Sequence, residues 1–188
     1  MNANQYIPAI VTFACTLFAF HLLRKSRQDD TPSLVNNDDM KNYFKDSEFT
    51  NSATATKLGI DNTPDAETWM RIYALRNNVL NPARHKLGRA VYITSGYRSP
   101  QLNAAVGGAA NSQHVKGEAV DLTTKTKTGN KALFKTLVQL GNFDQLIWEK
   151  GGEWVHVSYH DSANRGQMLS YNGTGYQNIN NNWQTAIA

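Results

Sequence analysis

The chain has 188 residues, enough for one domain of ordinary size and a shorter additional segment. Its formal net charge of +4 is modest, and no run of Lys or Arg is long enough to indicate a nucleic-acid partner, so we expect none. With a single cysteine, Cys15, no disulfide can form within the chain. The composition leaves the oligomeric state open.

The first segment contains an uncharged run from Tyr6 to Leu23, residues 6–23, which has no Asp, Glu, Lys or Arg. Its length is close to the minimum for a membrane-spanning helix. The residues before it lack the positive charge that usually precedes the apolar core of a cleavable signal. We therefore predict an N-terminal transmembrane helix that anchors the chain through residues 1–27, with an export signal as the alternative. Three basic residues follow the run directly, which by the positive-inside rule favours a cytoplasmic domain.

Residues 28–39 are polar and contain Pro32, so they are predicted to be a linker, and residues 40–188 a single globular domain. In this domain Thr63-Pro64 predicts a helix start, with Thr63 as the N-cap and Pro64 in the first helical position. Apolar residues then recur at helical spacing, which predicts a buried face rather than a binding site. They are Trp69, Ile72, Tyr73, Val79 and Leu80.

The middle of the chain alternates β-type runs with helical patterns. Two apolar runs flank Gly151-Gly152, a strong signal for a β-hairpin. The predicted fold class is α+β, a small antiparallel sheet flanked by helices, and the Asn- and Gly-rich tail after Tyr171 suggests no further element. The expected strands are 90–94, 119–122, 144–149 and 154–159, and the expected helices 99–105 and 130–140.

Two histidines and an aspartate stand out among these elements. His114 and Asp121 are seven positions apart, and Gly117 between them permits a tight turn, so a loop histidine and a strand aspartate can converge on one ion. His156 lies in the middle of a predicted strand. Two His and one Asp form the ligand set of a catalytic zinc site that keeps a fourth position open. We therefore predict that the chain binds one Zn²⁺ and is a zinc hydrolase. If His156 is considered without the other two residues, the better interpretation is a hydrogen-bonded core histidine.

Several motifs together resemble the D-alanyl-D-alanine carboxypeptidase family of zinc peptidases: SGYRS, SQH, GEAVDL, FDQLIWE and WVHVSY. That family includes bacteriophage L-alanyl-D-glutamate endolysins and vancomycin-resistance dipeptidases, and it shares a fold with the hedgehog signalling domain. The resemblance extends from about Phe49 to Arg165. It implies a zinc metallopeptidase that hydrolyses a stem-peptide bond of peptidoglycan, D-Ala-D-Ala or L-Ala-D-Glu, in a phage or a bacterium. It also implies that His114, Asp121 and His156 are the zinc ligands.

The resemblance suggests roles for further residues. Arg98 of SGYRS would correspond to the arginine that steadies the substrate carbonyl and the charge of the transition state. Tyr97, Ser112 and Gln113 are the candidates for contact with substrate, although Ser112 could equally cap a loop. Glu118 alternates away from Asp121 and is expected to face solvent.

Two glutamates are candidates for the general base. Related enzymes often carry an acid three residues before the last histidine, which is Glu153 here, whereas FDQLIWE resembles a hedgehog-type segment whose acid, Glu149 here, lies beside the metal. If the hairpin turns at Gly151-Gly152, Glu149 pairs with Trp154 and shares the face of His156, and Glu153 falls on the opposite face. We therefore favour Glu149, and a bulge near Trp154 would exchange the two roles.

The sequence leaves two questions open. A non-catalytic zinc module that binds cell wall or a partner protein is the alternative function, although a module has no need for both an arginine and a base. An enzyme that degrades cell wall must also face outward or be released, which conflicts with the cytoplasmic side favoured by the flanking charges. A membrane-tethered component of a phage particle is compatible with the enzyme.

Overall fold

The computed structural model describes residues 41–188, so the predicted anchor (1–27) and linker (28–39) lie outside it. Between residues 41 and 188, no helix is both long and apolar enough to cross a membrane. The transmembrane helix through residues 6–23 therefore stays a prediction.

The first part of the described chain is helical. It contains α2 (Asp46–Thr50), α3 (Ala53–Leu58), α4 (Ala66–Leu75), a π-helical segment η2 (Arg76–Leu80) and α5 (Asn81–Leu87). The predicted start of α4 was wrong by two residues, because Asp65 and not Thr63 is the N-cap: its carboxylate accepts a hydrogen bond from the Thr68 amide at 2.7 Å. The predicted apolar stripe does face the core, with Ile72 buried and Trp69 packed beside it.

The second part forms a six-stranded sheet in the order β1-β2-β4-β3-β5-β6. The α+β class is confirmed, but the sheet is larger than expected and not wholly antiparallel, because β5 runs parallel to β3. The tail after Tyr171, for which no element was expected, supplies β6 and α8, and β5 just before it was not among the expected strands. The strands are β1 (Tyr92–Ser95), β2 (Ala119–Thr123), β3 (Gln145–Glu149), β4 (Trp154–Ser158), β5 (Gln167–Tyr171) and β6 (Tyr176–Asn178), and the helices are α6 (Pro100–Ala105), α7 (Lys127–Leu140) and α8 (Trp183–Ala186).

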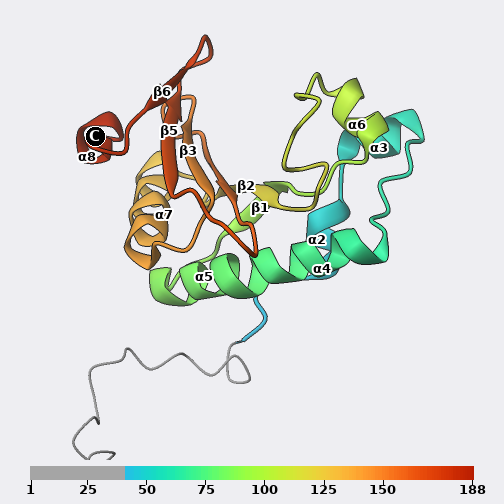
Figure 1. The fold of residues 1–188 in the computed structure, drawn as a ribbon, viewed down its shortest axis with the longest axis horizontal. Coiled ribbons are helices and arrows are strands. Elements are labelled where there is room, and N and C mark those ends of the chain that lie inside the picture. The colour runs from blue at the N-terminus through green and yellow to red at the C-terminus, as the bar shows by residue number, and fades with distance from the viewer. Residues whose placement is uncertain (1–40) are drawn as a thin grey trace, which may run out of the picture. The chain divides into compact units, whose positions relative to one another are not determined.

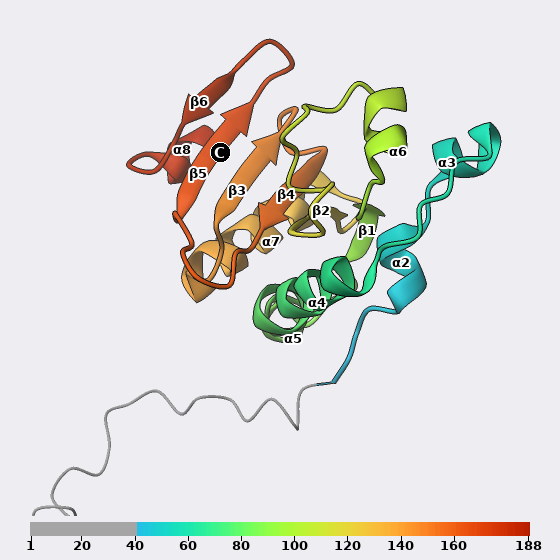
Figure 2. The ribbon, with the colours of Figure 1, turned by 45° about the vertical axis from the view of Figure 1, so that its right-hand side comes forward.

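One face of the sheet is covered by α7, as Figures 1 and 2 show. Alternate strand residues such as Val155 and Trp148 point to this face and are buried against the helix. The rings of Phe134 and Trp148 meet edge to face, with centroids 5.8 Å apart. The intervening strand residues therefore face the other side of the sheet, which α7 leaves uncovered.

The hairpin between β3 and β4 has the predicted register: Glu149 pairs with Trp154 and Ile147 with His156. Gly151 and Gly152 both have positive φ, and a side chain at Gly152 would collide with the ring of Trp148. The turn therefore requires glycine at this position, which fixes the pairing of the two strands.

The register defines two rows of side chains on the uncovered face. The first, which we call the histidine row, crosses the sheet through Asp121, His156, Ile147 and Leu169. The second row lies two residues nearer the hairpin turn on β3 and β4. We call it the aromatic row, and it consists of Trp154, Glu149, Tyr171 and Tyr176.

Candidate metal centre

His114, Asp121 and His156 meet at the histidine row. The Nε2 atom of His114 lies 3.3 Å from Nδ1 of His156 and 3.4 Å from Oδ1 of Asp121, and Nδ1 of His156 lies 3.0 Å from the same oxygen. Strands β2 and β4 hold Asp121 and His156 as direct cross-strand partners. His114 comes from the loop between α6 and β2, so a loop and two strands converge as the sequence predicted.

Further hydrogen bonds orient these three side chains. Nδ1 of His114 lies 2.7 Å from the carbonyl oxygen of Gly96, which favours a proton on Nδ1 and leaves Nε2 as the electron-pair donor. The second carboxylate oxygen of Asp121 accepts a hydrogen bond from Nη2 of Arg98 at 3.1 Å. Burial alone raises the pKa of Asp121, but the charges and hydrogen bonds of His114 and His156 outweigh burial and hold that pKa below its usual range.

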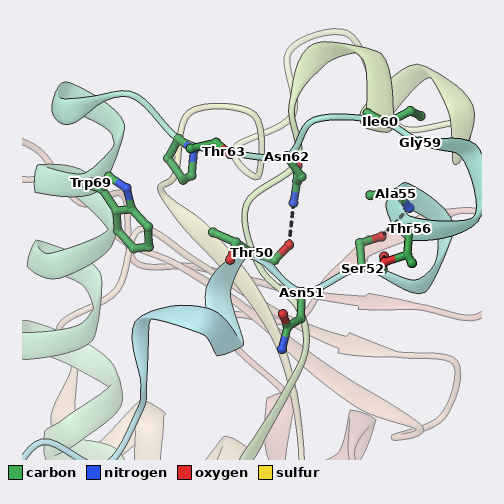
Figure 3. A pocket seen from close by; sticks show the side chains of 11 residues that line it. Thr50, Asn51, Ser52, Ala55, Thr56, Gly59, Ile60, Asn62, Thr63 and Trp69 are labelled. Carbon is green, nitrogen blue, oxygen red and sulfur yellow. Dashed lines mark hydrogen bonds between the residues drawn. The ribbon is translucent and has the colours of Figure 1, made fainter.

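The side chain of Asn62 forms hydrogen bonds with the backbone of the SGYRS segment. Its Nδ2 donates to the carbonyls of Thr50 at 2.8 Å and Tyr97 at 3.0 Å, and its Oδ1 accepts from the Ser99 amide at 2.7 Å. Figure 3 shows Asn62 pointing toward Thr50 at a cavity of about 370 Å³, which is lined by uncharged residues. One buried amide therefore fixes the backbone on both sides of Arg98. This residue was not predicted from the sequence, because a single Asn before a helix has no distinguishing spacing.

A larger cleft of about 1140 Å³ lies over the uncovered sheet face and is bounded by the loop before β2. Ser112, Gln113 and Arg98 line it together with the three converging residues. Tyr97 is not among the lining residues and packs against the hydrophobic core instead. The Ser112 hydroxyl also accepts a hydrogen bond from the His114 amide at 3.3 Å, so it supports its own loop as well as bordering the cleft.

The two candidate bases occupy different environments. Glu149 lines the cleft with only 7% of its surface exposed, and its carboxylate makes no hydrogen bond or ion pair with any residue in the range 41–188. Burial raises its pKa to about 7, against the opposing effect of His156 and with a smaller contribution from Asp121. Glu153 is exposed in the hairpin turn and does not line the cleft.

Arg98 forms a direct hydrogen bond with one of the three candidate metal ligands, Asp121. Its Nε donates to the Ser95 hydroxyl at 3.0 Å while Nη2 binds Asp121. Its backbone amide donates to the carbonyl of His114 at 3.2 Å. The side chain thus connects β1 and β2, and the backbone amide connects this segment to the loop that carries His114. The remaining terminal nitrogen of the side chain, Nη1, makes no hydrogen bond to residues 41–188.

A second buried carboxylate, Asp144, also lines the cleft and is held by several hydrogen bonds. It accepts hydrogen bonds from Nε of Arg165 at 2.9 Å, from Nη2 of Arg165 at 2.6 Å and from the Gln113 side chain at 2.9 Å. These bonds, those of Arg165 above all, hold the pKa of Asp144 below its usual range. Asp144 thereby positions Gln113, the neighbour of His114. From the sequence, Asp144 was predicted only as part of a strand.

The expectation that Glu118 faces solvent was wrong. Glu118 is 7% exposed, and its Oε1 lies 3.9 Å from Nε2 of His160 at the cleft. The residue stands just before β2, where the chain has not yet entered the alternating pleat, so the period-two rule does not apply to it.

The donor set fits zinc. A tetrahedral ion with ligands at 2.0–2.2 Å requires ligand atoms roughly 3.3–3.6 Å apart. Two of the observed separations, 3.3 and 3.4 Å, lie in this range, and the third, 3.0 Å, is slightly shorter. Two imidazole nitrogens and one carboxylate oxygen are ligands that Zn²⁺ accepts. The three residues could therefore hold one metal ion and leave a fourth position facing the cleft.

Comparison with known proteins agrees with this chemistry. The family model described as Peptidase M15 matches residues 42–158, which is more than half of the chain. The matched range contains the three converging residues, Arg98 and both glutamates, and it ends before β5 and β6. No curated protein matches the chain significantly.

Proposed function

The chain belongs to the Peptidase M15 family, and on that premise we propose that it hydrolyses a stem-peptide bond of bacterial peptidoglycan. Membership makes it a zinc metallopeptidase that acts on cell-wall peptides. The proposal adds the residues: His114, Asp121 and His156 hold the zinc, Glu149 is the general base, and Arg98 assists. The bond is either D-Ala-D-Ala or L-Ala-D-Glu.

One observation carries the proposal: three ligand atoms with separations close to those of one face of a zinc tetrahedron border a cleft that also contains the Glu149 carboxylate, which has no partner among residues 41–188. When bound, zinc polarises the peptide carbonyl and lowers the pKa of water toward neutrality. The cleft is large enough for several residues of an extended peptide, so the reacting bond can lie against the centre while its neighbours occupy the rest.

Glu149 is suited to moving a proton. Glu149 pairs with Trp154, which lies two positions before His156 on β4, so Glu149 and His156 are diagonal neighbours on the sheet. Their Cβ atoms are then roughly 7–8 Å apart. At that distance the Glu149 carboxylate would be able to reach a water molecule held by a metal ion between the three ligands. Burial raises its pKa, which favours accepting a proton from the attacking water and returning it to the leaving amine. Glu153 is exposed in the turn and does not line the cleft, so Glu149 is the better candidate.

Arg98 has two tasks in this proposal. Its bond to Asp121 keeps that carboxylate turned toward the two histidines. Its unbonded Nη1 is available to the carbonyl oxygen of the substrate, where negative charge develops as water attacks. No covalent intermediate with a side chain is needed.

The non-catalytic module is disfavoured by Glu149. Glu149 is 7% exposed, and a carboxylate with so little exposure and no partner in the described part of the chain costs stability. A protein that only binds zinc gains nothing from retaining one beside the metal. A peptidase needs that carboxylate because it must carry a proton during the reaction.

Mass spectrometry of muropeptides tests the proposal. Purified peptidoglycan digested with the zinc-loaded full chain should give products cleaved at one stem-peptide bond, and the product masses identify which bond. A chelator should abolish these products, and separately Glu149→Gln should slow their formation about 100-fold or more. Unchanged muropeptides after prolonged digestion with protein that contains zinc would contradict the proposed activity.

A further inference from the structure

The aromatic row continues the cleft beyond the metal centre. Glu149 has Trp154 as its cross-strand partner on one side and Tyr171 on the other, and Tyr171 pairs with Tyr176 at the sheet edge. All four residues line the cleft. The proposed base therefore stands in a line of three aromatic side chains that extends across four strands.

These rings are accessible rather than buried in the core. Tyr176 is 60% exposed, an unusual fraction for a large aromatic side chain. It packs against Tyr171, with ring centroids 4.7 Å apart and planes inclined by 33°, and the Tyr171 hydroxyl donates to the carbonyl of Gly173 at 2.9 Å. The hairpin of β5 and β6 thus holds a pair of rings in place at the border of the cleft.

A cation accompanies the rings. Nζ of Lys150 lies 5.3 Å from the centroid of the Trp154 ring, and Lys150 also lines the cleft. This end of the cleft therefore offers flat apolar surfaces, hydroxyl groups and one positive charge. A matching ligand has an apolar face, polar edges and a nearby negative charge.

We propose that the aromatic row binds a sugar ring of the glycan strand to which the stem peptide is attached. This inference rests on the proposed function and specifies its substrate. The alanine and glutamate residues at either candidate bond have no large flat side chain to stack on tyrosine, whereas one face of a pyranose ring presents C–H groups and its rim presents hydroxyls. Lys150 is placed to meet a carboxylate of the attached peptide.

The spacing allows one substrate to reach both places. His156 and Tyr171 are two strands and one row apart, which corresponds to roughly 12 Å between their backbones. An extended peptide covers that distance with about three or four residues. A glycan-linked peptide can therefore lie with a D-Ala-D-Ala bond, which several residues separate from the sugar, at the metal centre and its sugar on the aromatic row. An L-Ala-D-Glu bond lies one residue from the sugar and is too close to it for this arrangement, so a sugar on the aromatic row favours D-Ala-D-Ala as the reacting bond.

A binding measurement tests this inference independently of hydrolysis. The full chain is titrated with the peptide-free disaccharide N-acetylglucosaminyl-N-acetylmuramic acid, and Trp fluorescence is recorded for wild type and for Trp154→Phe. We expect saturable binding, a signal that depends on Trp154, and affinity at least tenfold weaker in Tyr176→Ala. Tyr176→Phe, which keeps the ring, should bind more tightly than Tyr176→Ala.

Tyr92→Ala is the matched control, because Tyr92 is also exposed and has a lysine over its ring, yet it does not line the cleft. It should bind the disaccharide like the wild type. Absence of saturable binding to the wild type, or equal weakening by Tyr92→Ala and Tyr176→Ala, would overturn the inference. Circular dichroism and the melting temperature establish that each variant is folded.

Kinetics separate this inference from the proposed function. Wild type should hydrolyse a disaccharide-linked stem peptide with kcat/KM at least tenfold above that for the same peptide without sugar, and Tyr176→Ala should bring this ratio close to one. An unchanged ratio in Tyr176→Ala would contradict a sugar site. If neither substrate is hydrolysed but the disaccharide still binds through Tyr176, the proposed function fails while the sugar site stands.

Discussion

The histidine row and the aromatic row lie one step apart on the same sheet face, yet they are built differently. The side chains of Asp121 and His156 are largely buried and are bonded to each other, to His114 and to Arg98. Tyr176 is mostly exposed at the sheet edge and contacts another ring. The first row also lies within the family match, apart from Leu169, whereas two of the three rings of the second lie beyond it.

This difference suggests that the cleft separates chemistry from recognition. A metal centre requires ligands held to within a fraction of an ångström, which explains the hydrogen bonds around the histidine row. A stacking surface requires only accessible, correctly oriented rings, and a hairpin supplies these without a buried network. Changes to the histidine row should therefore abolish activity, and changes to the aromatic row should alter substrate preference.

The largest expected effect is loss of the metal. The full chain should contain close to one zinc ion, and His114→Ala or His156→Ala should lose most of it together with activity, since two ligands hold zinc much less tightly than three. Metal analysis after dialysis measures this. His85→Ala is the control, because His85 is exposed and its imidazole bonds only to the hydroxyl of Tyr43 among residues 41–188. Stoichiometric zinc in the double variant His114→Ala/His156→Ala would contradict the assignment.

The next effect distinguishes the two glutamates. Glu149→Gln should bind zinc normally but lose about 100-fold or more in kcat, the usual contribution of a general base. Glu153→Gln should stay within a few-fold of wild type, because an exposed charge in a turn contributes little. Single-turnover assays of both fully metallated variants provide the comparison. An inactive Glu153→Gln beside an active Glu149→Gln would restore the alternative base.

The raised pKa of Glu149 predicts a pH dependence. A general base must be ionised, so kcat/KM should fall about tenfold per unit as the pH drops below the pKa of Glu149 and reach a plateau above it. That pKa is about 7 without a metal, and the positive charge of zinc lowers it, so the fall should begin at or below pH 7. A pH–rate profile whose acidic limb persists unchanged in the residual activity of Glu149→Gln would show that another group titrates.

A smaller effect is expected at Asn62. Removing its side chain leaves two carbonyls and one amide without their partner, which should lower the free energy of unfolding by about 1–3 kcal/mol. Because the freed segment carries Arg98 and the Gly96 carbonyl that orients His114, zinc affinity should fall about tenfold in Asn62→Ala. Asn51→Ala is the control, since Asn51 borders the same cavity but is exposed (Figure 3). Equal zinc affinity in the two variants would exclude a positioning role.

The smallest effect should follow from Tyr176→Ala on the metal centre itself. The ring is 60% exposed at the sheet edge and packs on Tyr171, so zinc content should equal that of wild type and the free energy of unfolding should change by no more than about 0.5 kcal/mol. Metal analysis and denaturant titration check both values. Loss of zinc in this variant would show that the two rows are coupled rather than separate.

The centre of the sheet could be predicted because local chemistry specifies it. Gly151 and Gly152 can adopt positive φ, which placed the turn and therefore the partners of Glu149 and His156. His114, Asp121 and His156 carry a recognisable ligand set. The prediction of Glu149 over Glu153 rested on this register and on the resemblance of FDQLIWE to the hedgehog-type segment.

The remainder depends on contacts that sequence spacing does not reveal. Strand β5 contains only partly buried residues and pairs in parallel with β3, so it lacks an apolar pattern and has no turn signal that joins it to β3. The turn from β5 to β6 does carry a hairpin signal, Asn172-Gly173, which was interpreted only as part of the Asn- and Gly-rich tail. Asn62 and Asp144 act through single side chains that reach distant segments. Helix α4 begins two residues later than predicted because the Asp65 carboxylate, and not the Thr63 hydroxyl, accepts the hydrogen bond at the N-cap.

Anomalous diffraction at the zinc edge, from crystals of the full chain grown with zinc, tests the central claim most directly. We predict one strong peak about 2.0–2.2 Å from Nε2 of His114, Nδ1 of His156 and Oδ1 of Asp121. The Glu149 carboxylate should face the fourth side of the ion, across the cleft. A peak bound by other residues, or no peak near these three atoms in protein that retains zinc and activity, would contradict it.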